Sequence, residues 1–261
     1  MRYLKLFSAA VFLDLILLGC SGTGADKTTA TGNPDPAGSS GSGKDMYYEY
    51  TSTTAGSDIT IKSNTRMYIS SSGDMRVEMD IENSAAKGKQ HGPIVTIGRP
   101  DKPDESISID DDTKTYSVNH FNASDFNTGE KVKSTATKMG DEKILGFNSV
   151  HAKIISDKTI GSLYSEVDTL DLWRSSDVPL IASVRDLMDK FNSKTGMTLY
   201  TPETENQLKQ MGCEGFMTKL EIHSKRSSVT EVLTKVEHRD LPAALFQIPA
   251  GYKETKDGIG Q

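Results

Sequence analysis

The sequence predicts an α+β, mainly β fold: a curved antiparallel sheet of eight or more strands, with about two helices covering its concave apolar face. Two observations support this prediction. Short segments alternate apolar and polar residues and are separated by turn residues, which is typical of β-hairpins. One later segment instead repeats its apolar residues at helical spacing. With 261 residues, 35% of them hydrophobic, the chain is long enough to bury a sizeable core.

A first hairpin is predicted from residues 66–69 and 76–81, which flank the turn sequence Ser71-Ser72-Gly73-Asp74. Pairing Ile69 with Val77 places Arg66 opposite Asp80 on the polar face, which is a favourable cross-strand pair. The same register places the apolar residues on the other face: Met67, Ile69, Val77, Met79 and Ile81.

Two more hairpins are predicted, from Ser106–Asp111 with Lys114–Val118 and from Phe216–Ser224 with Ser228–His238. The apolar face of the first contains Ile107, Ile109, Tyr116 and Val118, with Ile109 opposite Tyr116. A three-residue loop in the second would place on one face Phe216, Leu220, Ile222, Thr230, Val232 and Val236. That register stays open, because it sets two glutamates against each other.

Five further strands are expected at 46–54, 59–62, 94–98, 149–156 and 165–174. The alternation predicts an antiparallel sheet with one solvated face. Because the apolar face needs a cover, helices are expected there. A first helix is indicated by helical spacing of Leu180, Ile181, Val184, Leu187, Met188 and Phe191. A second, weaker helix is expected over Pro202–Met211, ending at Gly212.

Two helices would leave part of this sheet face free for a ligand. Trp173 alternates with Leu172, so one of the two faces the cavity. The candidate cavity residues are Met67, Ile69, Val77, Met79, Ile107, Ile109, Tyr116, Trp173, Leu187, Met188, Phe191, Phe216, Leu220 and Ile222.

The N-terminal residues indicate export. Residues 1–19 combine a basic start with a short apolar run, which is typical of a secretory signal peptide. Leu17-Leu18-Gly19-Cys20 resembles the lipobox of bacterial lipoproteins, and this resemblance implies lipidation of Cys20 and a membrane anchor. Residues 20–44 hold the cysteine and a Gly/Ser/Thr-rich segment that we expect to act as a flexible linker. Residues 45–261 then form the folded domain.

Four stretches of the domain carry a resemblance to a known family: Ser106–Val118, Glu142–Phe147 with Ala152–Ile154, Leu170–Arg174 with Val178-Pro179, and Leu245–Tyr252. They resemble a family of bacterial envelope lipoproteins of unassigned function, which is in turn similar to the LolA/LolB-type lipoprotein carriers. The resemblance implies a half-barrel around a hydrophobic cavity closed by helices. Because Ser21 is not aspartate, the lipoprotein sorting rule favours the outer membrane.

Several classes of function are excluded. A formal net charge of −6 offers no general attraction to nucleic acid, and two cysteines cannot form a disulfide framework. The residues form no constellation of nucleophile, base and oxyanion donors, so we expect no enzyme, no metal and no cofactor. A binder of a lipid or other hydrophobic ligand is expected. The alternative is a structural lipoprotein whose core is filled by its own side chains and which binds an envelope protein.

Overall fold

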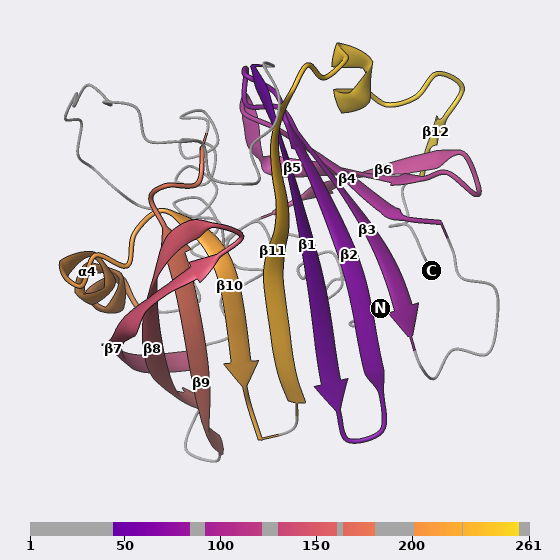
Figure 1. Cartoon of the computed structure of the whole chain (residues 1–261). Helices are drawn as coiled ribbons and strands as arrows, with labels where there is room; N and C mark the ends of the chain where they lie inside the picture. The colour runs from indigo at the N-terminus through magenta and orange to yellow at the C-terminus, as the bar shows by residue number, and fades with distance from the viewer. Residues whose placement is uncertain are drawn as a thin grey trace.

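The computed structural model describes residues 44–83, 92–121, 130–160, 164–180, 201–225 and 227–255. Within these residues twelve strands form a curved, twisted sheet (Figure 1) in the order β12-β6-β5-β4-β3-β2-β1-β11-β10-β9-β8-β7. Their bounds are β1 (Asp45–Gly56), β2 (Thr60–Ile69), β3 (Met75–Asn83), β4 (Ile94–Arg99), β5 (Lys102–Asp110), β6 (Thr115–His120), β7 (Glu130–Ile144), β8 (Phe147–Ile160), β9 (Tyr164–Ser175), β10 (Phe216–His223), β11 (Ser227–Arg239) and β12 (Lys253–Glu254).

The sheet consists of two meanders, β1–β6 and β7–β11, which join where β1 pairs with β11 along its whole length. All pairs are antiparallel except β12 with β6. Strands that follow one another pair because the connections between them are short. The prediction of a mainly β, antiparallel sheet is therefore confirmed.

The two faces of the sheet follow from the register. Val236, Tyr48, Met67 and Val77 lie opposite one another across β11, β1, β2 and β3, and directly opposite residues share a face. We call the face that carries these four residues the inner face and the other one the outer face.

The predicted register of the first hairpin is wrong by two residues. Met67 pairs with Val77, and Ile69 pairs with Met75. The reason is a tighter turn: Gly73, at φ 93°, donates its N–H to the carbonyl of Ser70, so β3 begins at Met75. A shift of two residues keeps every side chain on its predicted face, because side chains alternate with period two.

Of the other two predicted hairpins, one has the predicted register and the other does not. Ile109 pairs with Tyr116 and Ile107 with Val118, as predicted. In the β10–β11 hairpin, Leu220 pairs with Glu231, one residue away from the three-residue-loop register. Near the turn this one-residue shift reverses the faces of the second strand, so Thr230 and Val232 lie on the outer face instead. Val236 keeps its predicted inner position, because the register between β1 and β11 shifts between Glu49 and Tyr50.

One of the two predicted helices lies within the described residues. It is α4 (Pro202–Gln210), whose N-cap Thr201 accepts a hydrogen bond from the N–H of Thr204. Gly212, at φ 74°, follows the helix in the left-handed conformation that commonly ends helices. The first predicted helix, apart from Leu180, falls within residues 181–200, which lie outside the described part and include Leu187, Met188 and Phe191.

The expectation of one fully solvated face is wrong on the outer side of β4–β6. There Val95, Ile97, Ile107 and Ile109 form a small second core. Ile248 and Tyr252, among other partly buried residues, pack against it. We call residues 241–255 the C-terminal segment; it includes the 3-10 helix η1 (Ala243–Phe246) and β12.

The sequence did not predict β7 or β12, which form the two edges of the sheet. β12 covers the edge of β6, where the N–H of Thr255 donates to the carbonyl of Tyr116 at 2.8 Å. β7 forms the opposite edge, and the N–H of Ala136 there donates to Oε1 of Gln207 on α4 at 2.8 Å. A bulge between Lys138 and Gly140 interrupts the regular ladder. Such devices discourage pairing with another chain.

Candidate functional site

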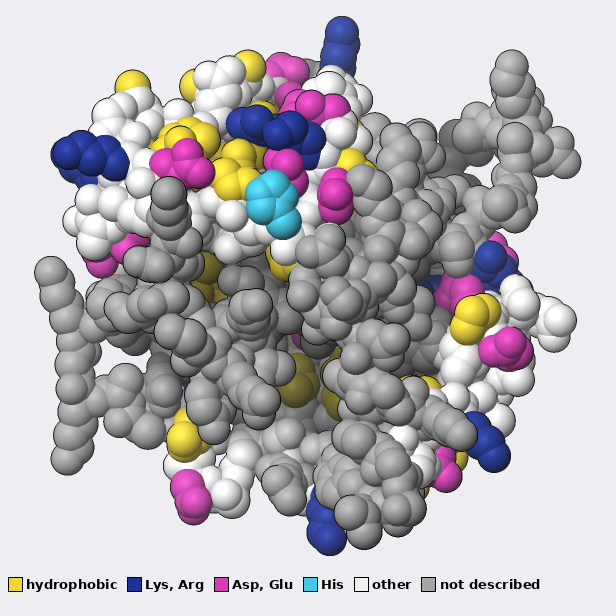
Figure 2. All heavy atoms as spheres, turned by 180° about the vertical axis from the view of Figure 1, so that it is seen from behind, with side chains coloured by type: hydrophobic (Ala, Val, Ile, Leu, Met, Phe, Trp, Pro, Cys, Tyr) yellow, Lys and Arg dark blue, Asp and Glu magenta, His cyan; other side chains and the backbone are white. Residues whose placement is uncertain are grey.

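The inner face carries the larger hydrophobic cluster of the molecule. It extends over β1–β3 and β8–β11, and Leu208 of α4 also belongs to it. In the view from behind (Figure 2), hydrophobic side chains are visible near the centre, set back from the charged side chains at the periphery. Five methionines contribute to this cluster: Met46, Met67, Met75, Met79 and Met217.

Aromatic side chains occupy the middle of the cluster. The ring of Tyr48 stacks on Phe216, with 4.5 Å between the ring centroids. The ring of Tyr50 is tilted against Phe216, with 6.2 Å between the centroids. Both tyrosine hydroxyls donate to backbone carbonyls, Tyr48 to Pro179 at 2.6 Å and Tyr50 to Met217 at 2.9 Å. Burial raises the pKa of Tyr48. The polar ends of these rings are thus satisfied, and the surface they form is apolar.

Helix α4 is fastened to the inner face of β7 and β9 by polar contacts around one buried leucine. Leu208 is fully buried. The hydroxyls of Thr204 and Ser134 lie 2.6 Å apart, and Arg174 Nη1 is 3.2 Å from both carboxylate oxygens of Glu205. Arg174 is only 2% exposed, so this ion pair is largely removed from water.

Six of the candidate cavity residues come together in the inner-face cluster: Met67, Ile69, Val77, Met79, Phe216 and Leu220. Ile222 packs against its margin. The prediction missed Met46, Tyr48, Tyr50 and Met75, although the alternation of Met46, Tyr48 and Tyr50 along the first strand was a usable signal. Whether a ligand occupies this face stays a prediction.

Three candidates lie on the wrong side of the sheet. Ile107, Ile109 and Tyr116 belong to the second core, under the C-terminal segment. The reason is the register: Val77 on the inner face pairs with Thr96, so Val95 and Ile97 point outward, and Ile109 and Ile107 pair with these two. The hairpin itself shows which residues share a face, but not which face is the inner one.

Trp173 also lies on the outer face, because its neighbour Leu172 belongs to the inner cluster. Its indole N–H donates to Glu142 Oε2 at 2.9 Å, and its ring stacks on His151 with centroids 3.9 Å apart. Lys219 Nζ lies 4.2 Å from the ring centroid. Trp173 therefore packs among polar side chains on the outer face and does not line the inner face.

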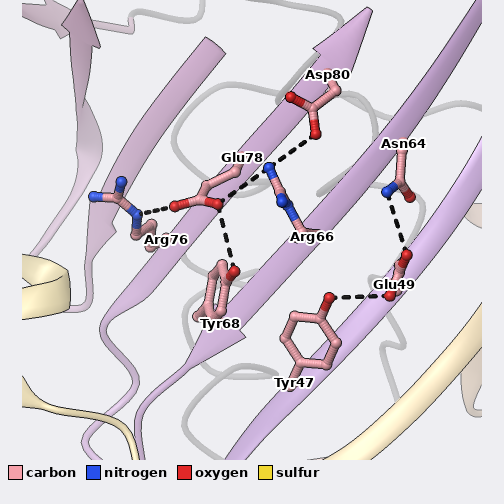
Figure 3. Close-up of polar contacts among 8 residues, drawn as sticks. All are labelled: Tyr47, Glu49, Asn64, Arg66, Tyr68, Arg76, Glu78 and Asp80. Atoms are coloured by element: carbon pink, nitrogen blue, oxygen red, sulfur yellow. Dashed lines mark hydrogen bonds and ion pairs between the residues drawn. The ribbon is translucent and has the colours of Figure 1, made fainter. Parts of the chain in front are cut away.

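The outer face of β1–β3 is polar and paired (Figure 3). Arg66 contacts Asp80 at 2.8 Å and Glu78 at 3.4 Å, and Arg76 Nε contacts Glu78 at 2.7 Å. Desolvation, strengthened by a hydrogen bond to Glu49, raises the pKa of Tyr47. Most of these groups pair with one another, as expected of a solvated sheet face, although Arg66 Nε has no hydrogen-bond partner among the described residues.

Within the described residues, histidine, cysteine and acidic side chains form no group that could hold a metal ion. None of the helices in the same part of the chain combines the length and apolar character that a membrane span requires. Cys20 and residues 1–43 lie outside the described part, so the anchor stays a prediction.

Three solved structures resemble the chain weakly. The LolA superfamily protein NE2245 from Nitrosomonas europaea has 8% identity and a TM-score of 0.34, with 78% of this chain and 90% of that chain covered. LprF from Mycobacterium bovis has 9% identity and a TM-score of 0.34, with 79% and 89% covered. A DUF1329 family protein from Desulfovibrio piger has 8% identity and a TM-score of 0.22, with 79% and 90% covered.

None of the curated proteins compared with the chain matches it. The sequence model of one family, described as "Domain of unknown function (DUF4412)", matches residues 53–252. This range begins within β1 and reaches the residue before β12, so it includes the second core and all of the inner-face cluster except Met46, Tyr48 and Tyr50. The chain therefore belongs to the DUF4412 family.

Proposed function

We propose that the protein is a non-enzymatic lipoprotein of the cell envelope that binds a lipid or another hydrophobic molecule on the inner face of its sheet. The observation that carries this proposal is the large hydrophobic cluster on the inner face, with its five methionines. Methionine side chains are flexible and polarizable, and they are typical of surfaces that adapt to different apolar partners.

The anchor is the second part of the proposal. Cys20 would receive acyl chains and hold the protein on a membrane, with the outer membrane favoured by Ser21. Two or more acyl chains anchor a protein durably, whereas one is marginal. A Cys20→Ala chain is expected to leave the membrane fraction. If this variant stays bound after a high-salt wash, the anchor is not Cys20.

The binding test uses residues 20–261 with Cys20→Ser, so that no acyl chain of the protein itself can occupy the inner face. The purified chain is extracted with organic solvent, and the extract is analysed by mass spectrometry beside a native mass spectrum. We expect a stoichiometric apolar molecule. An empty chain that also takes up no added fatty acid or phospholipid would contradict the proposal.

Two methionine variants locate the binding surface. Met79 is 7% exposed on the inner face, and Met139 on β7 is 51% exposed. We expect Met79→Lys to lose at least tenfold in lipid affinity, because a buried charge disfavours an apolar ligand beside it. Met139→Lys is the matched control and should bind normally. If Met79→Lys is folded by circular dichroism and binds like the parent chain, the ligand lies elsewhere.

A second candidate function rests on how deeply the inner face is buried. Tyr48 and Ile69 are 0% exposed, as expected of a core filled by its own side chains. In that case the protein would act through its polar outer face, by binding an envelope protein. The same extraction separates the two proposals, because a self-filled core yields no ligand and crosslinking in cells yields a partner.

A further inference from the structure

The inner face changes its chemistry from β3 to β6. Val77 lies in the hydrophobic cluster, but the residues opposite it in successive strands are Thr96, Ser108 and Ser117. The neighbouring row runs from Met75 through Gly98 and Ser106 to Asn119. We call the five small polar residues of these rows the hydroxyl patch: Thr96, Ser106, Ser108, Ser117 and Asn119.

Three residues of the hydroxyl patch are buried, Ser108 and Asn119 are partly buried, and one of the buried groups lacks a partner. Thr96 is 6% exposed, Ser106 2% and Ser117 3%. Asn119 Nδ2 donates to Ser108 Oγ at 2.9 Å. Ser117 Oγ, in contrast, has no hydrogen-bond partner among the residues described. A buried hydroxyl without a partner destabilises the protein, so a bound group that supplies one is favoured.

The hydroxyl patch is also uncharged, since its members are four hydroxyl residues and one amide. The carboxylates near the patch along β5 are Asp104 and Glu105, within two residues of Ser106, and Asp110, two residues from Ser108. Asp110 Oδ1 accepts the N–H groups of Asp112 and Thr113 in the hairpin turn. A phosphate or carboxylate bound at the patch would lose its hydration, and neither of the two residue rows that form the patch contains a Lys or Arg to compensate for this loss. Alcohol and amide groups suit a neutral ligand that both donates and accepts hydrogen bonds.

The distance from the patch to the apolar surface is short. Neighbouring strands lie about 4.8 Å apart, so the patch extends from about 5 to about 14 Å beyond β3. A single amphipathic molecule can therefore contact both surfaces, with its chain on the methionines and its head group on the hydroxyls.

We propose that the ligand of the inner face is a neutral amphipathic lipid whose hydroxylated head group, a glycerol or a sugar, hydrogen-bonds to the hydroxyl patch. This inference rests on the proposed function, because it needs an apolar chain bound beside Val77 and Met75. Ser117 supplies the hydroxyl that the protein leaves unpaired, and Thr96 lies between it and the hydrophobic cluster.

The test compares lipids that share one oleoyl chain and differ in the head group. Residues 20–261 with Cys20→Ser are titrated with monooleoylglycerol, an oleoyl glucoside, oleate and oleoyl lysophosphatidylglycerol, and affinities are measured by calorimetry. We expect at least one of the two neutral lipids to bind tenfold more tightly than both anions. Whether the glycerol or the sugar binds more tightly identifies the source of the hydroxyls.

Two variants and one control test whether the head group of the lipid binds at the hydroxyl patch. Thr96→Val keeps the shape of the side chain and removes its hydroxyl, and Ser117→Ala removes the unpaired hydroxyl. Each is expected to weaken the neutral lipid about tenfold and to leave oleate unchanged. Ser117→Ala should not lower the melting temperature, because the hydroxyl has no partner to lose. Thr169→Val, on the outer face of β9, is the control.

The outcomes are distinct. Equal affinity for all four lipids, or unchanged affinity of both variants for the neutral lipid, overturns the head-group assignment and leaves the proposed function standing. Binding of none of the four by a folded chain overturns the proposed function as well.

Discussion

At the scale of the residue, Glu237 shows how the outer face links stability to pH. Its carboxylate accepts charged hydrogen bonds from Lys235 and Arg239, and the one from Lys235 is the main cause of its lowered pKa. A lowered pKa in the folded state means that the ionised carboxylate stabilises the fold. This stabilisation is complete above the ordinary glutamate pKa and is lost as the pH falls through the lowered value.

Glu237→Gln is therefore expected to lower the free energy of unfolding by about 1 kcal/mol at pH 7, because partly exposed ion pairs contribute little more. The difference between the variant and the parent should shrink towards zero as the pH falls below the ordinary glutamate pKa. Urea denaturation at several pH values measures it. Glu214→Gln, at an exposed position, should show no such trend. A constant difference at all pH values would contradict the linkage.

At the scale of the element, α4 depends on the pair between Glu205 and Arg174. Glu205→Gln would take the Glu205 carboxylate away from the almost fully buried charge of Arg174, which costs about 3 kcal/mol of unfolding free energy. Glu203→Gln removes the same charge from the first turn of the same helix at an exposed position, and we expect a loss below about 0.5 kcal/mol. Equal losses in the two variants would show that the ion pair does not fasten the helix.

At the scale of the whole molecule, the C-terminal segment holds the far end of the sheet together. Ile248 packs on the second core, Arg76 donates to the carbonyl of Leu245, and a hydrogen bond to Asp111 raises the pKa of Tyr252. These contacts join the last described residues to β3 and to the β5–β6 hairpin.

Ile248→Asp is expected to release this segment, because a carboxylate does not pack on an apolar surface. The second core would then face water, and the variant should bind an apolar fluorescent dye and aggregate on mild heating. Gln247→Asp, an exposed neighbour, should do neither. The absence of dye binding by Ile248→Asp would mean that the second core does not depend on this contact.

The sequence-based predictions were correct where the structure depends on residues close together in the sequence, and they failed where it depends on residues far apart. The β5–β6 pairing was correct because its turn residues are adjacent in sequence, and α4 was found because Thr201, Pro202 and Gly212 mark its ends. β7 was missed because its inner positions include Ser134 and Ala136, which are too small or polar to give an apolar alternation. The β10–β11 register stayed open in the sequence, because nothing local distinguishes a one-residue change of loop length, and the structure pairs Leu220 with Glu231.

By itself, the sequence determined that the folded part of this protein is mainly β, and which residues of the first two predicted hairpins share a face. Both follow from local periodicity and composition. Only the tertiary structure decided which face is the inner one, because this choice depends on strand partners far apart in sequence, such as β1 with β11. It placed Ile107 and Trp173 outside and brought Ser117 into one row with Val77. Alternation with period two separates the residues of a strand into two faces but does not say which face is the inner one, and long-range packing decides this.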